Sequence, residues 1–376
     1  MHPQPPAVPF DARPLTEPVD PRAVAEFARE MRRRTPPSTA GVVFTVIAAV
    51  FVVAVALPVV GAMTVVLATV LSHGGDLSAL AVVPILLLAL TIVGGAVFGV
   101  LSWRRRREQR YRIARFAAAN NMVYEDRIAD PQLPGMIFQH GSGRMSTSLV
   151  RGFHPRFVEF GNYQYTVKHG KSSTTYHWGY VAVRLDVPLP NIVLDAVGNN
   201  TLGSNLPASF SKDQRLSLEG DFDRYFTLYC PRGYEQDALY LFTPDIMARF
   251  IDHAAELDVE IVDDWMFLYM RRPVSTTDPA TWAWLFGIVG ALMTKFDQWA
   301  RWRDERLRAA QASAPPASTD AGPQKPLPFA PPAGMITPPP PGVAPEGRRL
   351  KKSTSWVTIL VFILMIVGWV WMQLDH

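Results

Sequence analysis

Cysteine is the scarcest residue in this 376-residue chain, which has Cys230 alone. One thiol excludes an internal disulfide and a cysteine-rich metal site, and it agrees with a reducing compartment. No base is adjacent to it, so we interpret Cys230 as a small buried hydrophobic residue. Gly141, Ser142 and Gly143 lack the further glycine and the Lys-Ser/Thr ending of a phosphate-binding loop. They predict a tight turn.

Metal-ligand spacing is also missing. Asp221 and Asp223 form an Asp-x-Asp pair of the kind that can bind a divalent cation, but the preceding Gly220 favours an ordinary turn. Asp263 and Asp264 are likewise interpreted as turn residues and not as cation ligands. The histidines have no i, i+4 spacing and no partner carboxylate motif. We therefore expect no catalytic residue, no cofactor and no metal site. The histidines considered are His140, His154, His169 and His177.

A basic surface typical of nucleic-acid binding is not indicated either. The net charge is +4, yet between Glu108 and Ala280 there are 17 Lys and Arg against 21 Asp and Glu. The excess positive charge therefore lies outside that segment, and we expect no nucleic-acid partner.

Long apolar runs, in contrast, are prominent. They cover residues 41–71 and 77–103, separated by a turn at 72–76 without Lys or Arg, and a third run covers 355–372. A helix needs roughly 20 apolar residues to cross a bilayer, so the sequence predicts an α-helical membrane hairpin and a single C-terminal transmembrane helix.

The basic residues that flank these runs predict an orientation. Arginines at 32–34 precede the first run, arginines at 104–107 follow the second, and Arg348, Arg349, Lys351 and Lys352 precede the third. Basic residues favour the cytoplasmic side. We therefore expect a multi-pass protein of the cell membrane with membrane lipids among its partners, a cytoplasmic N-terminus and main soluble domain, and an external C-terminus.

Residues 104–310 are predicted to form the cytoplasmic α+β domain, with a mainly antiparallel sheet. Period-two patterns indicate a hairpin of strands 157–167 and 175–186. Thr243 and Pro244 are typical of a helix start. Other strands are expected at 122–128, 191–197, 215–219, 225–230, 238–242, 259–262 and 266–270, the last two on either side of an Asp263–Asp264 turn.

Two further helices have clear starts. Asp20 and Pro21 begin an amphipathic helix within a proline-rich N-terminal segment, residues 1–40. Asp278 and Pro279 begin a Trp-rich helix, and its part at 281–302 could pack on its own domain, on the membrane interface or on a second copy.

Residues 311–347 form a proline-rich linker, which we interpret as a spacer. The spacing of Pro328 and Pro331 also matches a PxxP recognition element.

A family resemblance is carried by three short runs between 218 and 269: Gly220 to Phe226 with Leu228 and Tyr229, Ala238 to Pro244, and Val262 to Tyr269. These runs resemble a family of uncharacterised bacterial membrane-anchored proteins, one of the numbered domains of unknown function. That family usually places a cytoplasmic domain after two membrane helices. The resemblance implies no reaction and no catalytic residue, and the third apolar run and the long linker depart from it.

These observations favour a membrane-tethered binding or scaffold module over an enzyme. Its partner would be another protein or a second copy of the chain. The alternative is an enzyme acting on a membrane-proximal substrate, with Asp221, Asp223 and nearby histidines as its only candidates. A transporter is disfavoured because neither long apolar run carries an intramembrane charge.

Overall fold

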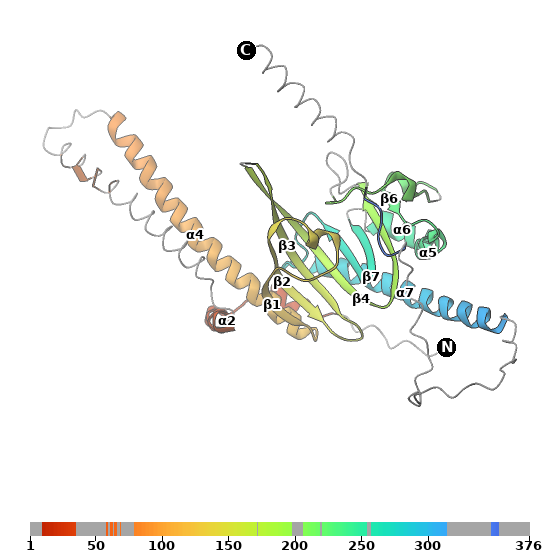
Figure 1. Cartoon of the computed structure of the whole chain (residues 1–376). Helices are drawn as coiled ribbons and strands as arrows, with labels where there is room; N and C mark the ends of the chain where they lie inside the picture. Colours follow the sequence, from red (N-terminus) through yellow and green to blue (C-terminus); the bar gives the residue numbers. More distant parts are fainter. Residues whose placement is uncertain are drawn as a thin grey trace, which may run out of the picture. The chain divides into compact units, whose positions relative to one another are not determined.

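The computed structural model describes residues 10–34, 58, 61–62, 64–65, 68, 79–170, 172–197, 206–218, 220–253, 257–313 and 347–352. The chain divides into two compact units (Figure 1). The first covers residues 11–116. The second, which we call the α+β unit, covers residues 1–10 and 117–376.

The described part of the first unit is mainly helical, with α1 (Arg13–Thr16), α2 (Pro21–Arg34) and most of α4 (Ala79–Ala119). The predicted start of α2 is confirmed, because an Asp20 side-chain oxygen accepts the N–H of Arg22 at 2.9 Å. Phe27 of α2 contacts Tyr111 of α4 edge to face, with ring centroids 5.6 Å apart.

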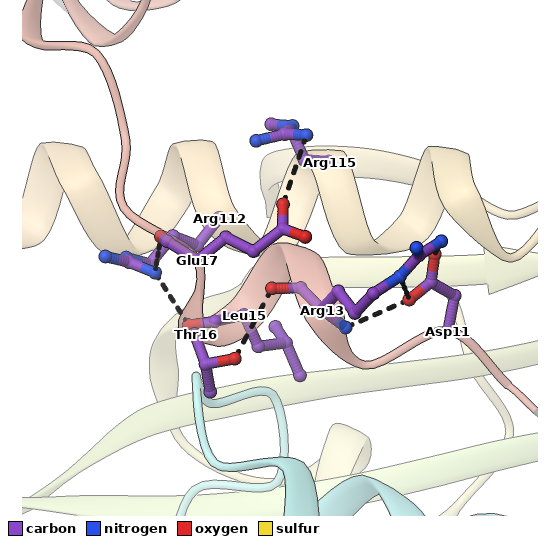
Figure 2. A network of polar contacts seen from close by, with 7 residues as sticks. All are labelled: Asp11, Arg13, Leu15, Thr16, Glu17, Arg112 and Arg115. Carbon is purple, nitrogen blue, oxygen red and sulfur yellow. Dashed lines mark hydrogen bonds and ion pairs between the residues drawn. The ribbon is translucent and has the colours of Figure 1, made fainter.

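Arg112 connects α4 to the chain that follows α1 (Figure 2). Its guanidinium donates to the carbonyl oxygens of Leu15 at 2.9 Å and Glu17 at 2.7 Å, and it also pairs with Glu108 one turn earlier on α4. The Glu17 carboxylate lies 3.8 Å from Arg115. The carbonyl oxygens at the end of α1, which have no partner within the helix, thus accept hydrogen bonds from the charged Arg112 guanidinium.

The predicted membrane spans are not present among the described residues, where no helix is both long enough and apolar enough to cross a bilayer. Helix α4 is one 41-residue helix, Ala79–Ala119, in which four arginines follow Trp103.

This finding overturns the predicted fold class, with its membrane hairpin and C-terminal span, and the multi-pass localisation. Residues 41–57, 71–78 and 353–376, which carried much of that prediction, lie outside the described residues.

One seven-stranded sheet forms the centre of the α+β unit (Figure 1). Its strand order is β1-β2-β3-β4-β6-β5, with β7 also paired to β4, and every pairing is antiparallel. The predicted α+β class with a mainly antiparallel sheet is thus confirmed for this unit. The strands are β1 (Val123–Ala129), β2 (Ser142–Gly152), β3 (Val158–His169), β4 (Ser172–Ala196), β5 (Arg215–Leu216), β6 (Phe226–Tyr229) and β7 (Asp258–Met270).

Strand β4 organises the sheet because it pairs with three others. Its residues 172–183 pair with β3, which confirms the predicted hairpin, and its residues 193–196 pair with β6. The two strands predicted at 175–186 and 191–197 are therefore one. Pro188 and Pro190 lie between the two paired segments, where their lack of an N–H costs no ladder bond to β3 or β6.

Strand β7 is also continuous, where a turn at Asp263 was predicted. Asp263 has a φ of 53°, and the register between β4 and β7 shifts beside it. Because side chains alternate along a strand, this bulge brings Glu260 and Tyr269 to the same face. The Tyr269 hydroxyl donates to Glu260 at 2.6 Å. Nine residues of flat strand would span about 30 Å, so β7 must be sharply bent.

Helices α5 (Glu235–Leu241), α6 (Pro244–His253) and α7 (Pro279–Ser313) complete the unit, with the short 3-10 helices η1 (Met136–Gln139), η3 (Lys212–Gln214) and η4 (Phe222–Arg224). The predicted starts of α6 and α7 are confirmed. The strand predicted at 238–242 is wrong, because this stretch belongs mainly to α5, whose first turn carries Glu235 and Asp237, residues that suit a helix N-terminus.

Helix α7 packs on its own unit, which was the first of the three alternatives. Trp282 and Leu285 are fully buried, and the rings of Trp282 and Phe286 both lie 5.3 Å from that of Phe160 on β3. The described N-terminal half of the helix therefore supplies core side chains to the sheet.

Candidate functional site

Residues 347–352 come back to the α+β unit from far along the chain and dock beside the irregular parts of β4 and β7. We call these six residues the docked segment. The docking site consists of the residues that hold it: Asn191, Phe210, Gln214 and Asp263.

Asn191 of β4 holds the centre of the docked segment. Its side-chain oxygen accepts the N–H of Leu350 at 2.9 Å, and its side-chain nitrogen donates to the carbonyl of Ile261 on β7 at 2.8 Å. Asn191 is buried. Its amide therefore satisfies main-chain groups on the segment and on β7 together, which fixes the orientation of the side chain.

Gln214 at the end of η3 binds the next residue in the manner of a neighbouring strand. Its side-chain oxygen accepts the Lys351 N–H at 2.9 Å, and its side-chain nitrogen donates to the Lys351 carbonyl at 3.0 Å. The N–H of Ser211 also donates to this carbonyl, at 3.0 Å, and Phe210 forms an antiparallel bridge with Lys352. Extended peptides that add to a sheet edge are recognised through main-chain bonds of this kind.

Arg349 forms a bidentate ion pair with Asp263. Its two terminal nitrogens lie 2.9 and 2.8 Å from the two carboxylate oxygens. Hydrogen bonding from Arg349 lowers the pKa of Asp263, and the same bond raises the pKa of the guanidinium. Both side chains are partly exposed, at 59% and 39%, so we expect the pair to contribute at most about 1 kcal/mol and to act mainly in selecting the segment.

Leu350 inserts its side chain into the hydrophobic core. It is 6% exposed and belongs to a cluster made mostly of aromatic and aliphatic residues on one face of the sheet. Burying a leucine side chain contributes about 1.5–3 kcal/mol, more than the ion pair next to it. The cluster includes Met136, Phe138, Tyr163, Trp178, Tyr180, Leu206, Val262, Phe267 and Tyr269.

Glu260 is a buried carboxyl on β7. It is 5% exposed, and one of its oxygens accepts both the N–H of Met136 at 2.7 Å and the hydroxyl of Tyr269 at 2.6 Å. Burial raises the pKa of Glu260 to about 7, against the lowering effects of these two bonds and of the positive charges of Arg349 and Lys352. The docked segment therefore brings positive charge toward a carboxyl that titrates near neutrality.

A second buried carboxyl, Glu159 on β3, has a different environment. It accepts the hydroxyl of Tyr180 at 2.5 Å and pairs with Arg151, which also binds Glu125 at 2.5 Å. The Tyr180 hydroxyl also contacts Ser146 at 3.0 Å. These partners satisfy the carboxylate within the sheet, so we assign it a structural role.

The aspartates considered as a cation site have turn roles. Asp223 accepts the hydroxyl of Ser217 at 2.5 Å and the N–H of Leu218 at 3.2 Å. The carbonyl oxygen of Asp221 accepts the N–H of Arg224. Within the described residues, no group of three His, Cys, Asp or Glu could hold a metal ion.

Among the side chains that the structure describes, the other residues considered in the sequence are not brought together into one site, and the side chain of His169 lies outside that part. His154 and His177 are exposed, whereas His140 is buried enough to lower its pKa, helped by nearby Lys352. Burial raises the pKa of Cys230 to about 12, which suits an inert core thiol. The turn predicted at 141–143 is only a bend at Gly141, because Ser142 and Gly143 already belong to β2, whose register with β3 shifts just after Ser142. Pro328 and Pro331 lie outside the described residues.

The docking site was missed by sequence reasoning. Asp263 was interpreted as a turn residue and Arg349 as a membrane-flanking charge, yet they pair across 86 positions of sequence. The available signal was Leu350, one apolar residue inside a basic run, but nothing local indicates what it packs against.

Comparison with known proteins adds little. No family model and no curated protein matches the chain. A solved structure, that of the mycobacterial trehalose monomycolate transport factor A, TtfA, matches with 14% identity over 50% of this chain and 91% of that chain, at a TM-score of 0.31. A likeness this low carries no argument about this chain. The resemblance to the membrane-anchored family stays a prediction.

Proposed function

We propose that this protein is a non-enzymatic binding module whose α+β unit recognises short extended peptides at the docking site. The observation that carries the proposal is the capture of Leu350: its N–H is bonded to Asn191 and its side chain is buried in the core. In this proposal the docked segment is the chain's own ligand, and a protein partner presents a similar one.

Three features of the site support selective recognition. Asn191 and Gln214 bind main-chain atoms, so these hydrogen bonds do not depend on the side chains of the ligand. Asp263 selects a basic residue, and the core selects an apolar residue directly after it. This combination is typical of peptide recognition by strand addition, where main-chain bonds give affinity and side-chain positions give specificity. The preferred ligand is a basic residue followed by leucine in an extended peptide.

The test uses the full-length chain with its own segment disabled by Leu350→Asp. A fluorescently labelled peptide of residues 345–354 should bind this variant saturably in an anisotropy titration, and it should bind the wild-type chain several-fold more weakly because the wild-type segment competes. The matched control is Lys351→Ala, which keeps the main-chain atoms that Gln214 binds and should behave as wild type.

A variant series at Asp263 tests which property of that residue matters. Asn and Gly both tolerate its φ of 53°, so Asp263→Asn and Asp263→Gly should keep the bulge while losing the charge. Both should weaken peptide binding by a similar factor. Equal binding of a peptide in which Arg349 and Leu350 are replaced by alanine would overturn the proposal.

A further inference from the structure

We propose that the docked segment exchanges between two copies of this chain, so that residues 347–352 of each copy occupy the docking site of the other. This inference rests on the proposed function, because it uses the same site. It names the partner as a second copy of the chain.

The contacts of the segment impose no preference for its own copy. They go to β4, β7 and residues 210–214 of the α+β unit, and each is a pairwise hydrogen bond, an ion pair or apolar burial. A segment from a second copy can make all of them unchanged. Reciprocal exchange gives a closed twofold dimer with two identical sets of contacts.

The length of the connection makes exchange competitive. About 33 residues, 314–346, separate the end of α7 from Gly347, and a chain of that length can reach at most about 110 Å. The effective concentration of a tethered ligand falls as its tether lengthens and is of millimolar order for short flexible tethers. Docking of the segment within its own copy is therefore favoured only while the concentration of the protein stays well below this effective concentration.

Reciprocity limits the cost of exchange. The first exchanged segment costs a bimolecular association, but the second docks within a pair that is already linked. Leu350 is buried and Arg349 is bidentate in both arrangements, so no new interface is needed. The balance between monomer and dimer then depends on concentration and not on new contacts.

Charge reversal in the full-length chain tests whether the docked segment exchanges between copies. In Asp263→Arg the site and the segment are both positive, and in Arg349→Asp both are negative, so each variant alone should be mainly monomeric. Mixed in equal amounts, each segment complements the site of the other variant. We expect at least a several-fold rise in heterodimer over either variant alone, measured by analytical ultracentrifugation with differently labelled chains.

Two controls keep the result interpretable. The double variant with both reversals should restore docking within one copy, which shows that the site tolerates arginine. A second measurement needs no charge reversal: in a Cys230→Ala background, a mixture of Asp263→Cys and Arg349→Cys chains should be cross-linked between chains by a short bismaleimide, which replaces the reach of the Arg349 side chain. The wild-type chain should dimerise increasingly with concentration.

Exchange is overturned if the charge-reversed mixture stays monomeric and the two cysteine chains do not cross-link. In that case the labelled peptide can still bind the Leu350→Asp chain, and the proposed function would stand without exchange. Failure of the peptide titration as well would remove both.

Discussion

Replacing Glu260 by Gln should remove a large pH-dependent part of the stability of the α+β unit. The same Glu260 oxygen accepts the Met136 N–H and the Tyr269 hydroxyl. A glutamine side-chain oxygen can accept both bonds, and its NH₂ group replaces the O–H of the protonated acid. The variant therefore resembles the wild-type chain with Glu260 permanently neutral.

The sign follows from the pKa, which burial raises from 4.5 to about 7. The folded state then binds this proton more tightly than the unfolded state does. Its stabilising effect is complete below about pH 4.5 and is lost as the pH rises through about 7. At 1.36 kcal/mol per pKa unit, the wild-type chain loses roughly 3 kcal/mol from this group over that range, whereas the Gln variant loses none.

The assay is urea unfolding followed by tryptophan fluorescence, which suits a chain with 10 Trp. Between pH 5 and pH 8 the free energy of unfolding of Glu260→Gln should rise relative to wild type by about 2.5 kcal/mol. Other titrating groups cancel in this difference. An unchanged urea m-value is the control that both chains unfold in the same transition. A difference that stays constant between the two pH values would refute the reasoning.

Three further changes test the packing. Leu350→Ala should weaken segment docking by about 2 kcal/mol, seen as faster hydrogen exchange at that amide. Asp223→Asn should lower the free energy of unfolding by about 1–2 kcal/mol, because the carboxylate loses charge-assisted bonds that include the one from Ser217, and urea titration measures this. Gly161→Ala should cost about 1–3 kcal/mol in the same assay, because its new Cβ would lie 2.8 Å from ring atoms of Tyr180.

Elements with strong local signals were predictable from the sequence. The period-two pattern located the hairpin of β3 and β4, and the residue pairs Thr243–Pro244 and Asp278–Pro279 located the starts of α6 and α7. The side chain of Asp278 accepts the N–H groups of Ala280 and Thr281, as an N-cap should. Each of these signals acts over a few neighbouring residues, so no tertiary information was needed.

The errors arise where tertiary context overrides a local pattern. Residues 238–242 have apolar and aromatic side chains that suit a strand, but α5 begins three positions earlier and continues through most of them. Apolar content alone predicted membrane spans, and among the described residues no helix is both long enough and apolar enough for one.

The docking site could not be predicted because its parts are far apart in sequence. Leu350 is bonded to Asn191 across 159 positions and Lys351 to Gln214 across 137. No periodicity or motif encodes such pairs. A basic run after a proline-rich segment has several common explanations, and membrane flanking was the one that agreed with the apolar run beyond it.

Asp263 connects the architecture of the sheet to the docking of the segment. Its positive φ creates the bulge that brings Glu260 and Tyr269 to one face, and its carboxylate binds Arg349. Asp and Asn are the residues other than glycine that most readily adopt this conformation, and only Asp adds the charge. The bend of β7 and the choice of ligand therefore depend on the same residue.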